Sequence, residues 1–124
     1  MKKHTVLYVD DEESNLRIFK DTFRRDFIII TASSGKKALE LLNEQIVDVV
    51  ITDQRMPGMT GVQLLGEINK HFNEIPPQRL ILSGYSEDKD IKKAFQEYKL
   101  RNFIPKPWDY EQLKQVILES MINS

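Results

Sequence analysis

Short apolar runs alternate with amphipathic stretches five times along this chain, and that alternation limits its possible folds more than any other feature. The runs that we interpret as strands are residues 6–9, 27–30, 47–51, 80–82 and 103–104. The first is continuously apolar and the third is interrupted only by Asp48, which is typical of strands buried on both faces. Strict alternation of strand and helix predicts an α/β fold, in which a parallel sheet carries helices on both faces and the crossovers are right-handed.

The stretches between the runs carry apolar residues at helical spacing, which predicts five helices. Residues 60–63 and 109–112 have the pattern of a capping box and predict where the third and fifth helices begin. Pro57-Gly58 and Pro76-Pro77 break the chain after the third run and before the fourth. The five apolar stripes are Leu16, Phe19 and Phe23; Ala38, Leu41 and Leu42; Leu64, Leu65, Ile68 and Phe72; Ile91, Ala94, Phe95 and Tyr98; and Leu113, Val116, Ile117 and Met121.

The composition excludes several classes of protein. A chain of 124 residues can bury a real core, and we expect a single domain over residues 1–124. The formal net charge of -1 gives no argument for binding nucleic acid or an anionic membrane. The lack of cysteine excludes disulfides and Cys-ligated zinc. The apolar runs are far shorter than the ~20 residues that cross a bilayer, and the first is too short for a signal peptide, so we expect a cytoplasmic location.

Polar side chains stand where four of the apolar runs end. Asp10 and Asp11 follow the first run, and Asp53 comes after the third. Ser83 follows the fourth run and Lys106 the fifth. In open parallel sheets, ligands bind beyond the C-terminal ends of the strands, at the point where the strand order reverses. We therefore expect these side chains to gather in one site.

Three carboxylates at one sheet edge predict a bound cation. Like charges this close raise each other's pKa and destabilise the fold unless a cation is present. Because only oxygen donors are offered, the expected ion is Mg²⁺ or Mn²⁺. The alternatives are that Asp53 caps a loop and that Asp10 and Asp11 complement the dipole of the first helix, which does not compete with metal binding.

An ammonium and a hydroxyl complete the set and predict a bound anion. Lys106 stands between two prolines that fix the backbone and aim the side chain, although an ordinary exposed lysine in a turn is the alternative. Ser83 precedes Gly84, so no neighbouring side chain obstructs its hydroxyl. A metal, a lysine and a carboxylate together are typical of phosphoryl transfer onto an aspartate. Of the two histidines, His4 precedes the first strand, and we interpret His71 as a charge at a helix C-terminus.

With these motifs the chain resembles the receiver domain of bacterial two-component response regulators over essentially its whole length. The matching stretches are residues 9–12, 53–61, 82–84 and 106–107. The resemblance implies a flavodoxin-like (βα)₅ fold, with a five-stranded parallel sheet in the order 2-1-3-4-5 and helices on both faces. It implies a phosphoacceptor switch that promotes its own phosphorylation and dephosphorylation, and not an enzyme. The implied phosphodonor is a sensor histidine kinase or a histidine phosphotransfer protein.

The resemblance assigns roles to the acidic residues. Asp53 would be the phosphoacceptor and would also contribute an oxygen to the metal. Asp11 looks like a direct metal ligand, and Asp10 would hold a metal-bound water. The main-chain carbonyl of Arg55 would supply a further ligand.

The resemblance also implies a way for the signal to leave the site. Ser83 and Lys106 would contact the phosphoryl group, and the peptide bond before Pro107 is expected to be cis. Phe103 matches the switch aromatic of the family. When Ser83 moves toward the phosphoryl group, Phe103 would become more buried and change the surface of the fourth helix, the fifth strand and the fifth helix. That surface carries charges of both signs, which suits self-association or equally a plain solvated face.

Arg55 and Tyr85 are expected to set the lifetime of the phosphorylated state, because both should flank the route of a hydrolytic water. Arg55 also argues against the main alternative, a phosphatase of the haloacid-dehalogenase type with Asp53 as its nucleophile. That family needs a second aspartate where Arg55 stands. A flavin carrier on the same fold is a further alternative, but residues 10–13 are all acidic and would repel a phosphate without a metal.

A docking surface for the phosphodonor is expected on the first helix. On a helical wheel Ile18 lies opposite the apolar stripe and beside Ser14. In similar receivers the histidine-containing partner docks there, and the resemblance adds Asn15 and Pro107 to this surface. The alternative is incidental exposure, because a single exposed isoleucine is normal on any surface.

Overall fold

A computed structural model describes residues 3–72, 74–84 and 89–122, and in this part of the chain strands and helices alternate strictly. The strands form one parallel sheet in the order β2-β1-β3-β4-β5, which confirms the predicted flavodoxin-like (βα)₅ fold. The elements are β1 (Thr5–Val9), α1 (Glu13–Phe23), β2 (Ile28–Ala32), α2 (Gly35–Glu44), β3 (Val49–Asp53), α3 (Gly61–His71), β4 (Gln78–Ser83), α4 (Lys89–Glu97), β5 (Leu100–Pro105) and α5 (Tyr110–Ile122).

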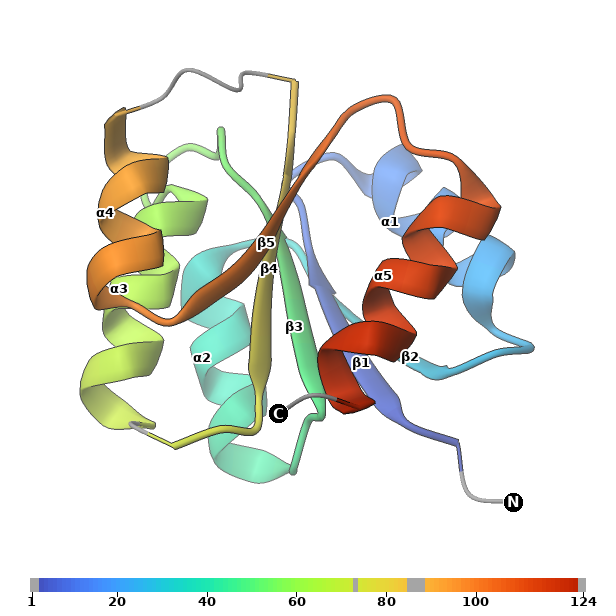
Figure 1. The fold of residues 1–124 in the computed structure, drawn as a ribbon, viewed down its shortest axis with the longest axis horizontal. Helices are drawn as coiled ribbons and strands as arrows, with labels where there is room; N and C mark the ends of the chain where they lie inside the picture. The colour runs from blue at the N-terminus through green and yellow to red at the C-terminus, as the bar shows by residue number, and fades with distance from the viewer. Residues whose placement is uncertain (1–2, 73, 85–88, 123–124) are drawn as a thin grey trace.

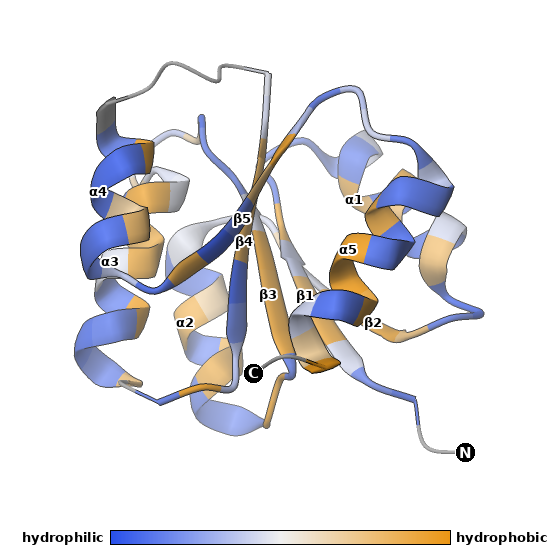
Figure 2. Cartoon of the chain, viewed as in Figure 1, coloured by the Kyte–Doolittle hydropathy of each residue, from blue (hydrophilic) through white to orange (hydrophobic). Residues whose placement is uncertain are grey.

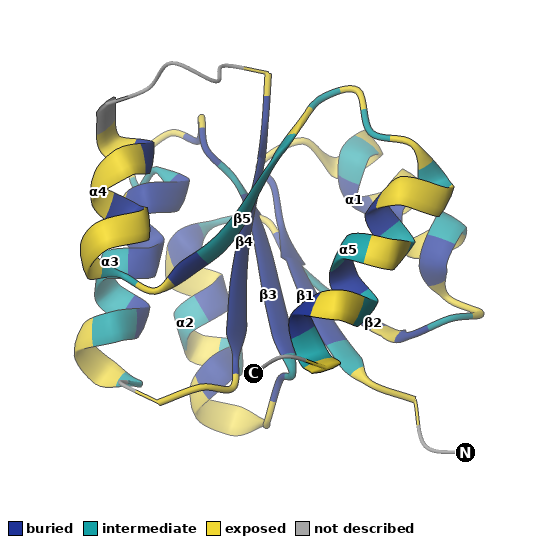
Figure 3. Cartoon of the chain, viewed as in Figure 1, coloured by how far each residue is buried: buried dark blue, intermediate teal, exposed yellow. Residues whose placement is uncertain are grey.

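The sheet lies between two helical layers. Helices α1 and α5 cover one face, and α2, α3 and α4 cover the other (Figure 1). Two apolar clusters fill the spaces between sheet and helices, one on each face. Strands β1, β3 and β4 are buried along almost their whole length, as expected for strands covered on both faces (Figure 3). Among the described residues, none of the helices is long and apolar enough to span a membrane.

The start of α3 is packed tightly against the end of β3. The predicted capping box is confirmed: the Gln63 backbone N–H donates to Oγ1 of Thr60, and the Thr60 N–H donates to Oε1 of Gln63. The buried Gln54 side chain accepts from the Val62 N–H at 2.8 Å. A Cβ at position 61 would lie 2.4 Å from the Asp53 carbonyl oxygen, so only glycine fits there. These contacts fix the loop that follows Asp53.

The fifth strand is longer than the sequence predicted. We expected residues 103–104, whereas β5 runs from Leu100 to Pro105. Arg101 and Asn102 interrupt any apolar run there, and both are half-buried. Because β5 is an edge strand with a single neighbour, it does not need the continuous apolar run of a central strand.

A buried arginine ties two helix ends to the sheet. The start of β4 is hydrophilic in Figure 2 and buried in Figure 3, because Arg79 lies there with no exposed surface. Its Nη1 donates to Oδ1 of Asn69 and to the carbonyl of Tyr98, and its Nη2 donates to the carbonyls of Phe72 and Glu74. Carbonyls at helix C-termini carry partial negative charge, so one guanidinium serves the ends of both α3 and α4.

Candidate functional site

The predicted acidic residues meet at the C-terminal edge of the sheet. Asp10 and Asp11 follow β1, and Asp53 ends β3, the neighbouring strand. Each offers a carboxylate oxygen, and these oxygens lie within 4.8 Å of one another. Asp10 is fully buried, Asp53 is half-buried and Asp11 is exposed. Such a set of hard oxygen donors fits Mg²⁺ or Mn²⁺.

Lys106 brings a positive charge to the same carboxylates. Its Nζ lies 3.4 Å from Oδ1 of Asp53 and 3.5 Å from Oδ2 of Asp10. The Lys106 backbone N–H donates to the carbonyl of Ser83, which joins the end of β5 to the end of β4. The peptide bond between Lys106 and Pro107 is cis, as the resemblance implied.

The electrostatic state of Asp53 reflects these neighbours. Burial raises the pKa of Asp53, and the Asp10 carboxylate raises it further, whereas Lys106 acts to lower it. The balance leaves the pKa of Asp53 above its ordinary value. A carboxylate that is partly desolvated and faces an ammonium is suited to accept an electrophile whose negative oxygens Lys106 can hold.

Asp10 is held by protein donors on both of its oxygens. Its Oδ1 accepts from the Glu12 backbone N–H at 3.0 Å. Its Oδ2 accepts from the Tyr8 hydroxyl at 2.7 Å and from Nδ2 of Asn15 at 3.1 Å. Burial, followed by the hydrogen bond to Asp10, raises the pKa of Tyr8, so this hydroxyl stays protonated and remains a donor.

In the sequence Tyr8 reads only as part of an apolar run, and its contact with Asp10 was not predicted. A usable signal was present, because residues two apart on a strand point to the same face. Tyr8 stands two positions before Asp10, so its hydroxyl could be expected to reach toward that carboxylate.

Ser83 and Phe103 lie on adjacent strands. Ser83 ends β4 and is buried, and Phe103 is half-buried on β5. Phe103 pairs with Ile81, which stands two residues before Ser83 and therefore points to the same face as Ser83. Phe103 packs against the apolar cluster that includes Ile91 of α4. The structure thus brings the predicted switch pair to the face of the sheet that α4 covers.

Arg55 and Tyr85 are the two residues predicted to set the lifetime of the phosphorylated state. Arg55 is exposed in the loop after β3, two positions beyond Asp53. Tyr85 lies outside the described residues.

Three of the four predicted docking residues line a hollow beside the carboxylates. Ile18 is 54% exposed on α1, and Ser14 is exposed one turn earlier. A hollow of about 510 Å³ is lined by Asn15, Ile18, Pro107 and three further residues. Asn15 is half-buried, and its amide donates to Asp10. This residue therefore belongs both to the hollow and to the acidic edge, by which we mean Asp10, Asp11 and Asp53 at the C-terminal edge of the sheet.

The histidines lie away from the carboxylates. His71, in the last turn of α3, has its Nε2 at 3.3 Å from Oε2 of Glu67, which fits the predicted role as a helix C-terminal charge. Nδ1 of His4 lies 3.7 Å from Oδ2 of Asp48. Both pairs stand at the N-terminal edge of the sheet.

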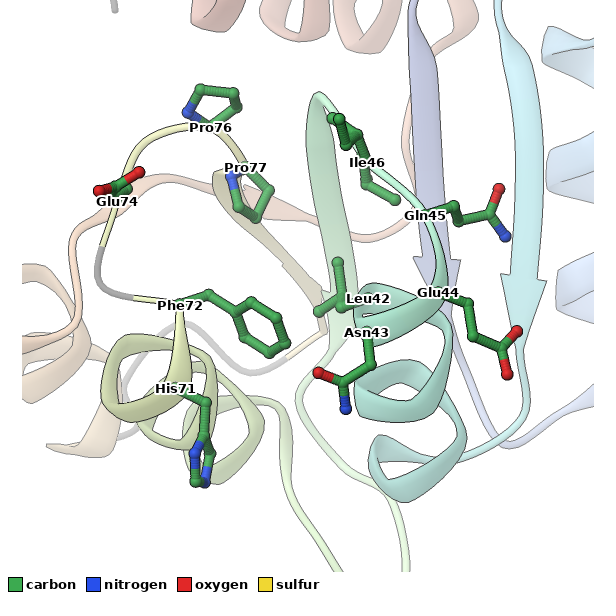
Figure 4. Close-up of a pocket in the computed structure, with 11 residues that line it drawn as sticks. Leu42, Asn43, Glu44, Gln45, Ile46, His71, Phe72, Glu74, Pro76 and Pro77 are labelled. Carbon is green, nitrogen blue, oxygen red and sulfur yellow. The ribbon is translucent and has the colours of Figure 1, made fainter.

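A second hollow also opens at this N-terminal edge, between the ends of α2 and α3. It has a volume of about 530 Å³. The Phe72 ring at the end of α3 points across it toward Leu42 of α2 (Figure 4). This hollow lies at the opposite end of the strands from Asp10, Asp11 and Asp53 and does not join the candidate site.

Comparison with known proteins places this geometry in a family. The family model that matches is the response regulator receiver domain, over residues 6–118. The hydrogenase transcriptional regulatory protein HoxA of Cupriavidus necator is 37% identical over 120 residues, which cover 97% of this chain and 24% of that protein. The chain therefore spans about a quarter of the length of this relative.

Solved structures show the same similarity. The signal receiver domain of an HD domain-containing protein from Pseudomonas fluorescens has a TM-score of 0.89 at 27% identity, covering 97% of this chain and 95% of that one. The response regulator TrrA from Thermotoga maritima, in complex with Mg²⁺ and BeF, has a TM-score of 0.83 at 25% identity, covering 94% of this chain and 98% of that one.

The sequence, the fold and the acidic edge thus agree, and the chain belongs to the receiver domains of two-component response regulators. Members of this family are regulatory phosphoacceptor domains. They bind Mg²⁺ at an acidic pocket and interact with histidine kinases or phosphotransfer proteins. The family and the fold that the sequence predicted are both confirmed.

Proposed function

We propose that this receiver is a signalling switch in which Asp53 accepts a phosphoryl group from a histidine kinase or a histidine phosphotransfer protein. The observation that carries the proposal is the position of the Lys106 ammonium between the carboxylates of Asp53 and Asp10. A carboxylate oxygen of Asp53 forms the new bond to phosphorus. The bond between phosphorus and the donor imidazole nitrogen breaks, and its electron pair leaves with the imidazole. Lys106 holds the phosphoryl oxygens in place.

Mg²⁺ or Mn²⁺ is the proposed cofactor, because Asp10, Asp11 and Asp53 offer clustered oxygen donors. When bound, the ion neutralises charge on the phosphoryl oxygens. We assign direct ligation to Asp11, Asp53 and the Arg55 carbonyl. Asp10 acts indirectly, through a metal-bound water, because both of its oxygens already accept hydrogen bonds from the protein.

The proposed output is a change in the surface made by α4, β5 and α5. A phosphoryl group on Asp53 draws the Ser83 hydroxyl toward itself. Phe103 then moves into the space that this hydroxyl has left beside β4. Phe103 packs against the apolar cluster that includes Ile91 of α4, which supports this route. A changed surface of this kind binds a partner or a second copy of the chain more tightly in the phosphorylated state.

Two further assignments extend the proposal. The exposed Arg55, together with Tyr85, slows hydrolysis by obstructing the approach of water to the phosphoryl group. The phosphodonor docks over Ser14, Asn15 and Ile18 of α1, next to Pro107, because this hollow opens beside Lys106.

The remaining properties follow from the same assignment. We propose a single domain over residues 1–124 that acts in the cytoplasm, where a kinase has access to ATP. A net charge of -1 does not favour direct binding to nucleic acid. The phosphatase alternative stays disfavoured because Arg55 stands where that chemistry needs an acid.

Labelling with a small acyl phosphate tests the proposal. In the presence of Mg²⁺ the chain is expected to gain one phosphoryl group that is labile in alkali, and Asp53→Asn should abolish the gain. Asp21→Asn is the matched control, because Asp21 is exposed on α1 and the chemical change is the same. Full labelling of the Asp53→Asn variant would refute the assignment.

A further inference from the structure

Asp10 is a buried carboxylate with three donors on a single oxygen. Its Oδ2 accepts from the Tyr8 hydroxyl at 2.7 Å and from the Asn15 amide at 3.1 Å, and it faces the Lys106 ammonium at 3.5 Å. The contact from Tyr8 is the shortest of the three. An ammonium that pairs fully with a carboxylate lies at about 2.8 Å. Lys106 is therefore not drawn fully onto Asp10, and its distance to Asp53 is almost the same.

The Tyr8 hydroxyl is held in place by a stack of aromatic rings. The rings of Tyr8 and Phe19 are stacked, with centroids 4.2 Å apart and an angle of 12° between their planes. The Trp108 ring meets Phe19 edge-on at 6.1 Å, and Trp108 stands two residues after Lys106. Tyr8 is only 1% exposed. Helix α1 and the segment before α5 thus fix where the hydroxyl points.

We propose that Tyr8 is a positioning residue for phosphoryl transfer, because its hydroxyl donates to Oδ2 of Asp10 and so leaves the Lys106 ammonium shared with Asp53. The inference rests on the proposed function of Asp53. Without this hydroxyl, a buried anion would lose its shortest donor, and the mobile charge nearest to it is the Lys106 ammonium. Lys106 would then move onto Asp10 and away from the oxygens that it holds on the incoming phosphoryl group.

The substitution Tyr8→Phe separates this role from packing, because phenylalanine keeps the ring that stacks on Phe19. At saturating Mg²⁺ and acyl phosphate, Tyr8→Phe is expected to slow labelling of Asp53 by about threefold to tenfold, as for the loss of one hydrogen bond. Tyr110→Phe is the matched control. It removes an equivalent hydrogen bond, in which the Tyr110 hydroxyl donates to Asp26 at 2.8 Å. That bond lies outside the acidic edge. This control should label at the unaltered rate.

A double variant tests whether Tyr8 acts through Asp10. In an Asp10→Asn background, where labelling is already slower, adding Tyr8→Phe should cause no further decrease in the labelling rate. An unchanged rate for Tyr8→Phe alone would overturn the proposal, as would an equal decrease in both backgrounds or an equal decrease in Tyr110→Phe. Absence of label on Asp53 in the unaltered chain would instead refute the proposed function, so the two failures are distinguishable.

Discussion

The Nζ of Lys106 lies 3.4 Å from Oδ1 of Asp53, so a cation that follows β5 faces an acid that ends β3. These strands are not neighbours, because β4 lies between them. The contact exists because both strands are parallel and end at the same edge of the sheet. Burial raises the pKa of Asp53, and Lys106 opposes that rise. The same ammonium that offsets the charge of Asp53 can hold the phosphoryl oxygens.

Replacing Lys106 with methionine should slow phosphorylation by an acyl phosphate on the order of tenfold or more, because the transferred oxygens lose their ammonium. The time course of labelling at saturating Mg²⁺ measures this effect. Lys36→Met is the control, because Lys36 is exposed on α2. If Lys106→Met labels as fast as the control, the ammonium is not part of the chemistry.

Mg²⁺ should stabilise the folded chain by mass action. At tenfold excess over its dissociation constant, the ion adds about 1.4 kcal/mol to the free energy of unfolding, which raises the Tm by a few degrees. Asp11→Ala should weaken this response, because it removes an exposed oxygen donor from the cluster. Calorimetric scans with and without millimolar Mg²⁺ measure it. If millimolar Mg²⁺ does not change the Tm of the unaltered chain, the metal site is contradicted.

Without metal, Asp53→Asn should increase stability at neutral pH. The pKa of Asp53 is raised in the folded chain, so its protonated form favours folding, and that contribution is lost as the pH rises through the folded-state pKa. The ionised group therefore costs stability at pH 7. The advantage of the variant should shrink below about pH 4, where the carboxyl is protonated in both states. Denaturant unfolding at several pH values tests the sign, and a variant less stable at pH 7 would contradict it.

The removal of Asp10 should not bring the same benefit, although charge crowding alone would suggest that it does. Asp10→Ala would leave the Tyr8 hydroxyl, the Asn15 amide and the Glu12 N–H without their acceptor. A buried donor without a partner costs about 1–3 kcal/mol.

Ser83 should relay the phosphorylated state to α4. Beryllofluoride with Mg²⁺ is expected to shift the NMR signals of Ser83, Phe103 and Ile91 together. In Ser83→Ala the mimic should still bind, while the shifts of Phe103 and Ile91 largely vanish. Ser33→Ala, an exposed position after β2, should leave all of these shifts intact. Undiminished distant shifts in Ser83→Ala would mean that the coupling takes another route.

An acid-sensitive ion pair between Asp26 and Lys114 joins the segment after α1 to α5. Burial alone would raise the pKa of Asp26, but the Tyr110 hydroxyl and the Lys114 ammonium hold it below its ordinary value. The ionised form thus contributes stability above the unfolded pKa of about 3.9, and this is lost as the pH falls through the folded-state pKa. Asp26→Asn should cost about 1 kcal/mol at pH 7. The cost should fade as the pH falls below about 4, and a cost that does not change with acidification would contradict the ion pair.

The acidic edge could be predicted because Asp10, Asp11 and Asp53 stand at the ends of buried strands. Parallel strands have their C-terminal ends at the same edge of the sheet, so these residues had to lie close together. Tyr8 escaped prediction because its ring belongs to the core, although its position two residues before Asp10 was a signal that its hydroxyl faces that carboxylate. Arg79 escaped because most of its partners are backbone carbonyls, which leave no signal in the sequence. The polar start of β5 was missed because an edge strand tolerates residues such as Arg101 that a central strand does not.

Chemical trapping identifies the phosphorylated residue itself. Borohydride reduces an aspartyl phosphate to homoserine, so peptide mapping by mass spectrometry locates the modified position. After labelling with acyl phosphate and Mg²⁺, homoserine is expected at position 53 and not at Asp10 or Asp11. Homoserine at either of those positions, or a phosphorylated chain without homoserine, would contradict the assignment of Asp53 as the phosphoacceptor.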